Sequence, residues 1–192
     1  MKITLLPTFF HRPVLKVAPE LLGKVLARKL PNGATARMQI TEVEAYDGER
    51  DLACHARYGR TQRTEVMYAS GGIWYVYLVY GMHHMLNIVT GPKDYPAAVL
   101  IRGVAHISGP GRVTKELFID KTFNGKAAHK QTGLWLEDSG AITPAKEIVR
   151  TPRIGVSYAK EWAEKPYRFV WNAPTASAGA GMSKTGEKYG IL

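Results

Sequence analysis

The sequence predicts a single α+β domain over residues 1–172: a mixed, mostly antiparallel curved sheet with a protruding β-hairpin and flanking short helices. Three observations predict this class. Short stretches rich in β-branched and aromatic residues recur along the chain, separated by turn residues. Helical patterns are few and short. No internal repeat or linker divides the chain, and its 192 residues suffice for one domain with a sizeable core.

The first elements are an irregular lead-in and a short helix. Residues 1–12 show no regular pattern. The helix is expected over residues 18–28, with a break near Gly23. Either Pro13 opens this helix or Pro19 lies in its first turn, because proline is tolerated at the first helical positions.

Two β-hairpins follow. The first has strands over residues 25–30 and 36–46 around Pro31-Asn32-Gly33, because Asn-Gly between alternating stretches is a strong hairpin signal. After a loop-rich segment, the second hairpin has a β-branched and aromatic strand over residues 73–80. It turns at Gly81-Met82 and returns over residues 84–90.

The last third of the domain is predicted to add strands and one helix. Gly109-Pro110-Gly111 precedes a helix start at residues 112–117. From Asn172 on, Ala, Gly, Ser and Lys dominate, so residues 173–192 are expected to form a flexible tail. Four apolar stretches are predicted strands: residues 97–104, 134–137, 154–156 and 168–171.

The charge of the chain predicts a polyanionic partner. Lys and Arg total 26 against 16 Asp and Glu, which gives a formal net charge of +10 and a pI of about 9.7. DNA, RNA or an anionic membrane would suit this excess. A merely basic surface or a ribosome-associated protein would have the same composition.

The composition also bounds the compartment. A lone cysteine, Cys54, excludes an intramolecular disulfide and a Cys-rich zinc cage. No secretory signal pattern is present, and no apolar run approaches the roughly 20 residues that span a bilayer. We expect an intracellular, cytoplasmic protein (nucleoid-associated if bacterial), monomeric and not bound to membranes.

Two carboxylates compete as the chemical centre. Glu42, Glu44 and Tyr46 share one face if their strand stays regular, and a partly desolvated carboxylate among aromatics can activate a water. Pattern alone cannot separate Glu44 from Glu42, and either can be an exposed strand glutamate. Arg102 lies in an apolar strand, where it either pairs with Glu44 and keeps it ionised or reaches water at the strand end.

Aromatic residues near these carboxylates can hold a flat ring. Tyr46, His55 and Tyr77 are candidate walls for stacking on a nucleobase, although strand tyrosines are usually ordinary core or rim residues. Tyr80 precedes Gly81 at a hairpin end, where it can wedge between base pairs or simply cover the turn.

Metal and phosphate motifs are weak in this chain. His83 and His84 are adjacent and point to opposite faces of a strand, so with His55 they make a poor metal site. No metal or cofactor is expected. Gly109-Pro110-Gly111 resembles a phosphate-binding hairpin of DNA-binding proteins, but a lone Gly-Pro-Gly is more often just a turn.

Taken together, these residues resemble the alkyladenine DNA glycosylases, also called 3-methyladenine or methylpurine DNA glycosylases. The combination is far more specific than any single motif. The resemblance runs through most of the chain and is carried by Arg12-Pro13, Val17-Ala18, Leu21–Gly23, Glu42–Tyr46, Ala53–His55, Arg60–Arg63, Met67-Tyr68, Gly72, Tyr75–Met82, Asn87, Val99–Arg102, Gly109–Gly111, Arg153–Gly155, Trp162 and Lys165-Pro166.

The resemblance implies roles by position, and it separates Glu44 from Glu42. Glu44 resembles the general base that activates a water to attack C1′ of a flipped nucleotide, and Arg102 resembles its partner in holding that water. The other implied roles are walls for the flipped base at Tyr46, His55 and Tyr77, a minor-groove wedge at Tyr80 with Met82 and His83, and a gate against guanine at Asn87.

Candidates for contact with the DNA backbone lie in the loop-rich segment and at the predicted helix start. They are Arg57, Arg60, Arg63, Gly109, Gly111, Arg112 and Lys115. Two positions depart from the family pattern. His83 stands where some relatives carry an aromatic residue, and Gln62 stands where relatives often have proline.

The expected activity is that of a monofunctional DNA glycosylase on double-stranded DNA with a damaged purine. It would excise alkylated or deaminated purines without a metal and without strand-nicking lyase chemistry. Two alternatives remain: a non-catalytic single-stranded nucleic-acid-binding module, in which Glu44 is structural, and a metal-dependent hydrolase that uses the histidines.

Overall fold

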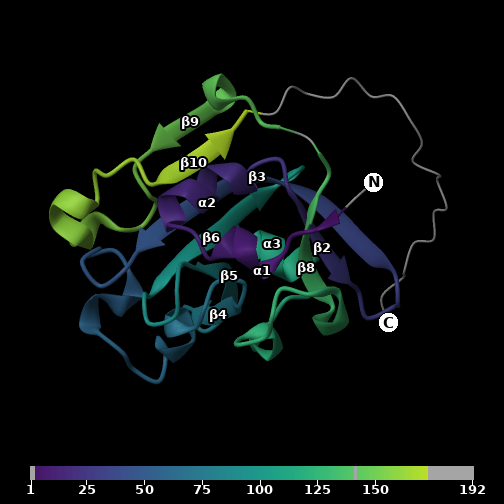
Figure 1. Cartoon of the computed structure of the whole chain (residues 1–192), viewed down its shortest axis with the longest axis horizontal. Helices are drawn as coiled ribbons and strands as arrows, with labels where there is room; N and C mark the ends of the chain where they lie inside the picture. Colours follow the sequence, from purple (N-terminus) through teal and green to yellow (C-terminus); the bar gives the residue numbers. More distant parts are fainter. Residues whose placement is uncertain (1–2, 141, 173–192) are drawn as a thin grey trace.

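The computed structural model describes residues 3–140 and 142–172, so the predicted tail over residues 173–192 lies outside the described residues (Figure 1). Ten strands of the described chain form one sheet in the order β1-β8-β2-β3-β6-β5-β4, with β10 beside β3, β9 beside β10 and β7 beside β6. Every pairing among them is antiparallel. The predicted α+β class is confirmed.

The strands and helices have the following bounds. The strands are β1 Ile3–Thr4, β2 Val25–Lys29, β3 Thr35–Asp47, β4 Trp74–Val79, β5 His83–Thr90, β6 Ala97–Val104, β7 Ile107–Ser108, β8 Leu134–Asp138, β9 Ile148–Thr151 and β10 Arg168–Trp171. The α-helices are α1 Pro7–Phe10, α2 Val14–Leu21 and α3 Pro110–Glu116. Short 3₁₀ helices are η1 His55–Tyr58, η2 Glu65–Tyr68, η3 Lys121–Phe123, η4 Lys130–Thr132, η5 Ala145–Glu147 and η6 Ser157–Trp162.

Strand β3 connects the two halves of the sheet. Its residues up to Gln39 pair with β2, and those from Ile40 on pair with β6. Glu42–Glu44 also pair with β10 on the other side. The register between β3 and β6 shifts on both sides of Glu42, which marks an irregularity of the β-bulge type. Such irregularities bend a strand and re-aim its side chains. Beyond Glu42 the strand is regular and carries Glu44 and Tyr46 toward the site.

The helix near the N-terminus begins directly after Pro13, one of the two predicted openings, and earlier than the expected range of residues 18–28. Helix α2 starts after Pro13 and buries Val14, Val17, Ala18 and Leu21, which form one stripe at helical spacing. Pro19 therefore lies inside the helix, and the residues after Gly23 belong to β2. The lead-in over residues 1–12 is also more regular than expected, because it contains β1 and α1.

The predicted strand over residues 154–156 is wrong. Ile154 and Gly155 form a turn, with Gly155 at φ 76°, and the strand of this region is β9 instead. Pro152 follows β9 directly, and proline has no N–H for a further ladder bond. The turn places the Ile154 backbone beside β3.

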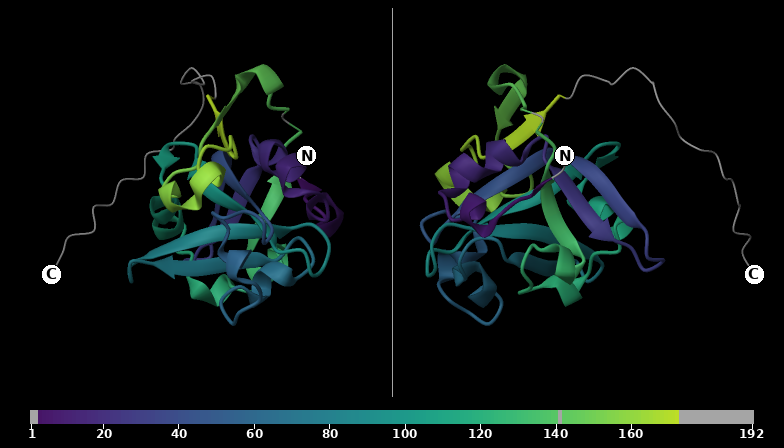
Figure 2. Two further views of the ribbon diagram at one scale, coloured as in Figure 1. Left: turned by 90° about the vertical axis from the view of Figure 1, so that its left-hand side faces the viewer. Right: turned by 45° about the vertical axis from the view of Figure 1, so that its right-hand side comes forward.

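The main core lies between the helices and the sheet. Helix α2 packs on β3 and β6, while α3 packs on β5 and β6. The β4–β5 hairpin extends from this body, as Figure 2 shows in its left view. A smaller apolar cluster of Cys54, Ala56, Met67, Tyr75, Val89 and Ala98 lies under the loop-rich segment. Within residues 3–140 and 142–172, no helix is long and apolar enough to cross a membrane.

Candidate active site

A cavity of about 270 Å³ opens where the end of β3 meets the β4–β5 hairpin. Its volume is near the lower end of small-molecule pockets. The loop before η1 and the turn at Ile154 complete its wall. The predicted site residues that line it are Tyr46, His55, Tyr77, Tyr80, Asn87 and Arg102.

The three predicted aromatic walls come from three different segments. Tyr46 belongs to β3, His55 to η1 and Tyr77 to β4. The His55 and Tyr77 rings meet edge to face with centroids 4.6 Å apart. Nδ1 of His55 lies 3.0 Å from the hydroxyl of Tyr75. Burial, with the nearby charges of Arg63 and Arg57, lowers the pKa of His55 to about 4, so its ring is neutral at pH 7.

The Glu44 carboxylate lies directly behind this wall, and its side chain is 0% exposed. Oε2 accepts a hydrogen bond from the Tyr46 hydroxyl at 2.8 Å, and Oε1 accepts one from the Ile154 N–H at 2.8 Å. Nε of Arg102 lies 3.4 Å from Oε1. Tyr46, Ile154 and Arg102 all line the cavity. Glu44 is therefore not a solvated strand residue.

Burial is the largest influence on Glu44, and it raises the pKa of the carboxyl above its ordinary value. The Arg102 charge and the hydrogen bonds from Ile154 and Tyr46 oppose this rise without cancelling it, and the charge of Glu42 adds to it. Arg102 thus favours the ionised form of Glu44, but burial outweighs it in the net direction of the pKa shift. A carboxylate with a raised pKa is a better proton acceptor.

Arg102 is shared between the two competing carboxylates. Its Nε lies 2.9 Å from Oε1 of Glu42, closer than to Glu44, and its side chain is 12% exposed. Glu42 also pairs with Arg168 at 2.7 Å. Glu42 is therefore held by two guanidinium groups, while Glu44 is held by one guanidinium, a backbone N–H and the hydroxyl of a cavity residue.

The second hairpin presents its tip to solvent. Tyr80 is 87% exposed, so its side chain does not pack over the turn. Met82 is 69% exposed. Tyr80 and Gly81 both have positive φ, at 52° and 70°, in a three-residue turn between Val79 and His83. His83 packs on the start of α3, where a Cβ at Gly111 would lie 3.1 Å from its ring.

Asn87 is buried in the cavity wall. Its Nδ2 donates to the backbone carbonyls of Tyr75 at 3.1 Å and Met85 at 3.2 Å. These two bonds fix the orientation of the side-chain amide beside the space in which a ring would lie.

Comparisons with known proteins show the family of this chain. A profile of the methylpurine-DNA glycosylase family matches residues 8–108 and 104–174. The chain belongs to this family. Relatives provisionally named 3-methyladenine DNA glycosylase include one from Methanocella arvoryzae, 44% identical over 88% of this chain and 93% of its own length. Another, from Psychrobacter cryohalolentis, is 42% identical over 86% of this chain and 90% of its own length.

In this family member, the arginines of the loop-rich segment have distinct neighbours. Arg57 lies over the rings of Tyr58 and Tyr158 at 4.3 and 4.8 Å. Arg60 pairs with Asp94 and lies 3.7 Å from Glu65, so carboxylates already balance its charge. Arg63 lies 5.1 Å over the Tyr77 ring, at the outer side of the cavity wall.

The candidates at the other side of the hairpin belong to α3. Gly109 caps this helix with φ 99°, and Gly111 lies under His83. Arg112 and Lys115 are exposed on the helix. Contact of any of these residues with DNA stays a prediction. Among residues 3–140 and 142–172, no group of three or more His, Cys, Asp or Glu side chains is arranged to hold a metal ion.

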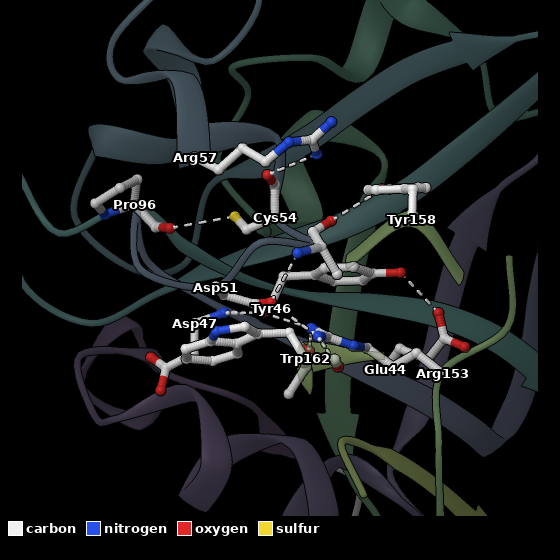
Figure 3. Close-up of polar contacts among 12 residues, drawn as sticks. Glu44, Tyr46, Asp47, Asp51, Cys54, Arg57, Pro96, Arg153, Tyr158 and Trp162 are labelled. Carbon is white, nitrogen blue, oxygen red and sulfur yellow. Dashed lines mark hydrogen bonds and ion pairs between the residues drawn. The ribbon is translucent and has the colours of Figure 1, made fainter. Parts of the chain in front are cut away.

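Sequence reasoning missed a buried ion pair between Asp51 and Arg153 (Figure 3). It also missed the Ile154 N–H as a donor to Glu44. Arg153-Ile154-Gly155 was part of the family resemblance, but its residues carried no assigned role. Asp51 stands in a loop and gave no pattern that would pair it with a residue 102 positions away.

Proposed function

We propose that this chain is a monofunctional DNA glycosylase that flips an alkylated or deaminated purine out of duplex DNA and excises it. The candidate substrates are 3-methyladenine, 7-methylguanine, hypoxanthine and ethenoadenine. The observation that carries this proposal is the buried Glu44 carboxylate, whose hydrogen-bond donors Tyr46 and Ile154 are themselves part of an aromatic cavity wall. Family membership supports the same activity.

The chemistry needs one activated water. Glu44 takes a proton from the water as the water oxygen attacks C1′. The bond between C1′ and the base nitrogen breaks, and the base leaves with the bonding electrons. An alkylated purine is electron-poor and leaves readily, so no metal or Schiff base is required. Arg102 orients Glu44 and the water. The Tyr46 phenol stays protonated as a donor, because burial and the Glu44 charge raise its pKa well above the ordinary value.

The surrounding residues serve base flipping and base choice. Stacking of a flipped base on Tyr46, His55 and Tyr77 offsets the cost of leaving the duplex. Tyr80, with Met82 and His83 beside it, fills the gap in the duplex from the exposed hairpin tip. Asn87 disfavours guanine, whose 2-amino group would clash with the cavity wall.

Base release tests this proposal directly. Duplex DNA with a single hypoxanthine or ethenoadenine is incubated with the protein in the presence of EDTA, and the free base is quantified. We expect release by the wild type and none by Glu44→Gln. Glu42→Gln is the matched variant. It should slow release only partly, because Glu42 acts on Glu44 through Arg102.

Each other outcome has a distinct meaning. Release by Glu44→Gln but not by Glu42→Gln would transfer the catalytic role to Glu42. Loss of wild-type release in EDTA would support a metal-dependent hydrolase. Binding without release from these lesions or from alkylated DNA would contradict the glycosylase and support the non-catalytic binding module.

A further inference from the structure

The ion pair of Asp51 and Arg153 is fully enclosed by protein. Both side chains are 0% exposed, and the two pairs of atoms lie 2.5 Å (Nη1 to Oδ2) and 2.8 Å (Nη2 to Oδ1) apart. Neither residue lines the cavity. A buried pair is costly to desolvate and is often replaceable by apolar residues without loss of stability. The segments that this ion pair holds in place therefore indicate its role better than its contribution to stability does.

This pair joins three segments that are distant in sequence. Asp51 accepts hydrogen bonds from the N–H groups of Asp47 and Ala53, both at 3.0 Å. Nη1 of Arg153 donates to the Ala45 carbonyl at 2.8 Å, and Nη2 donates to the Trp162 carbonyl at 3.2 Å. The end of β3, the loop before η1 and the chain from Arg153 to Trp162 are thus fixed to one another.

The same three segments carry the catalytic wall. The Arg153 guanidinium lies 4.8 Å from the centroid of the Tyr46 ring. The residue after Arg153 is Ile154, whose N–H donates to Glu44. Figure 3 shows Tyr46 directed at Glu44, with Arg153 and Asp51 beside its ring. A shift of Arg153 would therefore move a donor to Glu44 and the support of a wall together.

We propose that Arg153, locked by Asp51, is a positioning residue that holds the Ile154 N–H against Glu44 and the Tyr46 ring against the bound base. This inference rests on the proposed glycosylase activity. Arg153, which touches neither the cavity nor the water, would affect the rate of the chemical step and not the recognition of DNA.

The effect should be visible in the titration of Glu44. The groups that act most strongly on it are Arg102 from β6, Glu42 and Tyr46 from its own strand, and the Ile154 N–H. The charge of Arg153 also interacts with Glu44, and a lysine at that position would keep this charge. The Ile154 hydrogen bond lowers the pKa of Glu44. Loss of that bond alone should therefore raise the pKa further, while the other groups stay in place.

The test compares Arg153→Lys with Arg37→Lys. Lysine keeps a positive charge opposite Asp51, but a single ammonium cannot replace the planar fork that also reaches two carbonyls. Arg37, on the first half of β3, is the control because it also pairs with a buried carboxylate. Its Nε lies 3.0 Å from Oε2 of Glu137. Three quantities are measured: the single-turnover rate of hypoxanthine release at saturating protein, half-saturation by DNA, and the pKa of Glu44 by carboxyl ¹³C NMR, assigned with Glu44→Gln.

We expect Arg153→Lys to slow release at least 10-fold and to raise the pKa of Glu44, while half-saturation by DNA changes less than 2-fold. Arg37→Lys should leave all three unchanged. If Arg153→Lys fails to fold, the double variant Asp51→Leu/Arg153→Met removes both charges, and it should fold and show the same slow release.

Three results would overturn the positioning role: an unchanged rate and pKa in Arg153→Lys, a loss confined to half-saturation by DNA, or a fully active double variant. The NMR titration separates this failure from failure of the proposed function. If the wild type releases no base but Arg153→Lys still raises the pKa of Glu44, the positioning role stands and the glycosylase proposal falls.

Discussion

Strand β3 contributes to two buried carboxylate sites of similar composition, one in each half of the sheet. In the first half, Arg37 pairs with Glu137 of β8, which also accepts a hydrogen bond from Nε1 of Trp135 at 2.8 Å. In the second half, Glu44 is held by Arg102, Tyr46 and the Ile154 N–H. Glu137 is 1% exposed and Glu44 is fully buried, so burial does not distinguish them.

The two sites differ in where their donors lie. Arg37 and Trp135 are not part of the cavity wall, whereas every donor to Glu44 named above is. A buried carboxylate becomes a candidate base only when the groups that hold it also face space for a substrate. The Arg37–Glu137 site is thus part of the scaffold, while the donors to Glu44 face a cavity that a substrate can fill.

The largest expected effect comes from neutralising each carboxylate in turn. Glu44→Gln should slow base release by about 10²–10⁴-fold, the usual contribution of a general base. Its free energy of unfolding should be unchanged or raised, because burial disfavours the charge of Glu44. Glu137→Gln should lower the free energy of unfolding by about 1–3 kcal/mol, with release per folded molecule unchanged. Urea unfolding and single-turnover release on both variants measure this, and the reverse pattern would erase the distinction.

His55, in the cavity wall, should make the free energy of unfolding sensitive to acid. Its pKa is lowered from 6.5 to about 4 in the folded protein, so the unfolded chain binds a proton first as the pH falls. The associated stability is complete above pH 6.5 and should be lost on acidification toward pH 4, by about 2–3 kcal/mol. His55→Gln should remove this slope, while His106→Gln, an exposed control, should keep it. Urea unfolding at pH 7 and pH 4.5 gives the comparison, and equal slopes in all three proteins would refute it.

Tyr80 should matter for duplex DNA more than for a base that is already unpaired. Tyr80→Ala should weaken binding and release on duplex by about 2 kcal/mol, or roughly 30-fold, because the gap in the stack stays unfilled. The loss on single-stranded substrate should be smaller. Phe118→Ala is the control, because it truncates an exposed aromatic residue far from the hairpin in sequence, whose carbonyl accepts a hydrogen bond from Arg28 of β2. Equal losses on both substrates would contradict the wedge.

Substitution of Asn87 should have the smallest effect, and only on the discrimination between bases. Asn87→Ser shortens the amide beside the cavity, so the ratio of normal guanine to hypoxanthine release should rise by about 10-fold, or roughly 1.4 kcal/mol. Competition between the two bases in one duplex measures this ratio. An unchanged ratio would remove Asn87 from base discrimination while leaving the roles of Glu44 and Tyr80 intact.

Local signals in the sequence sufficed for most strands and for the projecting hairpin. The strand over residues 73–80 followed from its β-branched and aromatic residues, and the turn followed from Gly81. Local signals failed for residues 154–156, where Ile and Val flank a glycine that has a positive φ. They also placed the first helix four residues late, because the apolar stripe from Val14 outweighs the internal Pro19.

The sequence by itself determined the α+β class, the family and the residue types that surround the cavity, because these depend on short-range periodicity and on motifs. Only the tertiary structure decided how the charges are partnered. Arg102 is shared by Glu42 and Glu44, 60 and 58 positions away, and Ile154 reaches Glu44 across 110 positions. Pairing over such distances depends on β3 passing between β6 and β10 and on the turn after β9, and no local pattern encodes either.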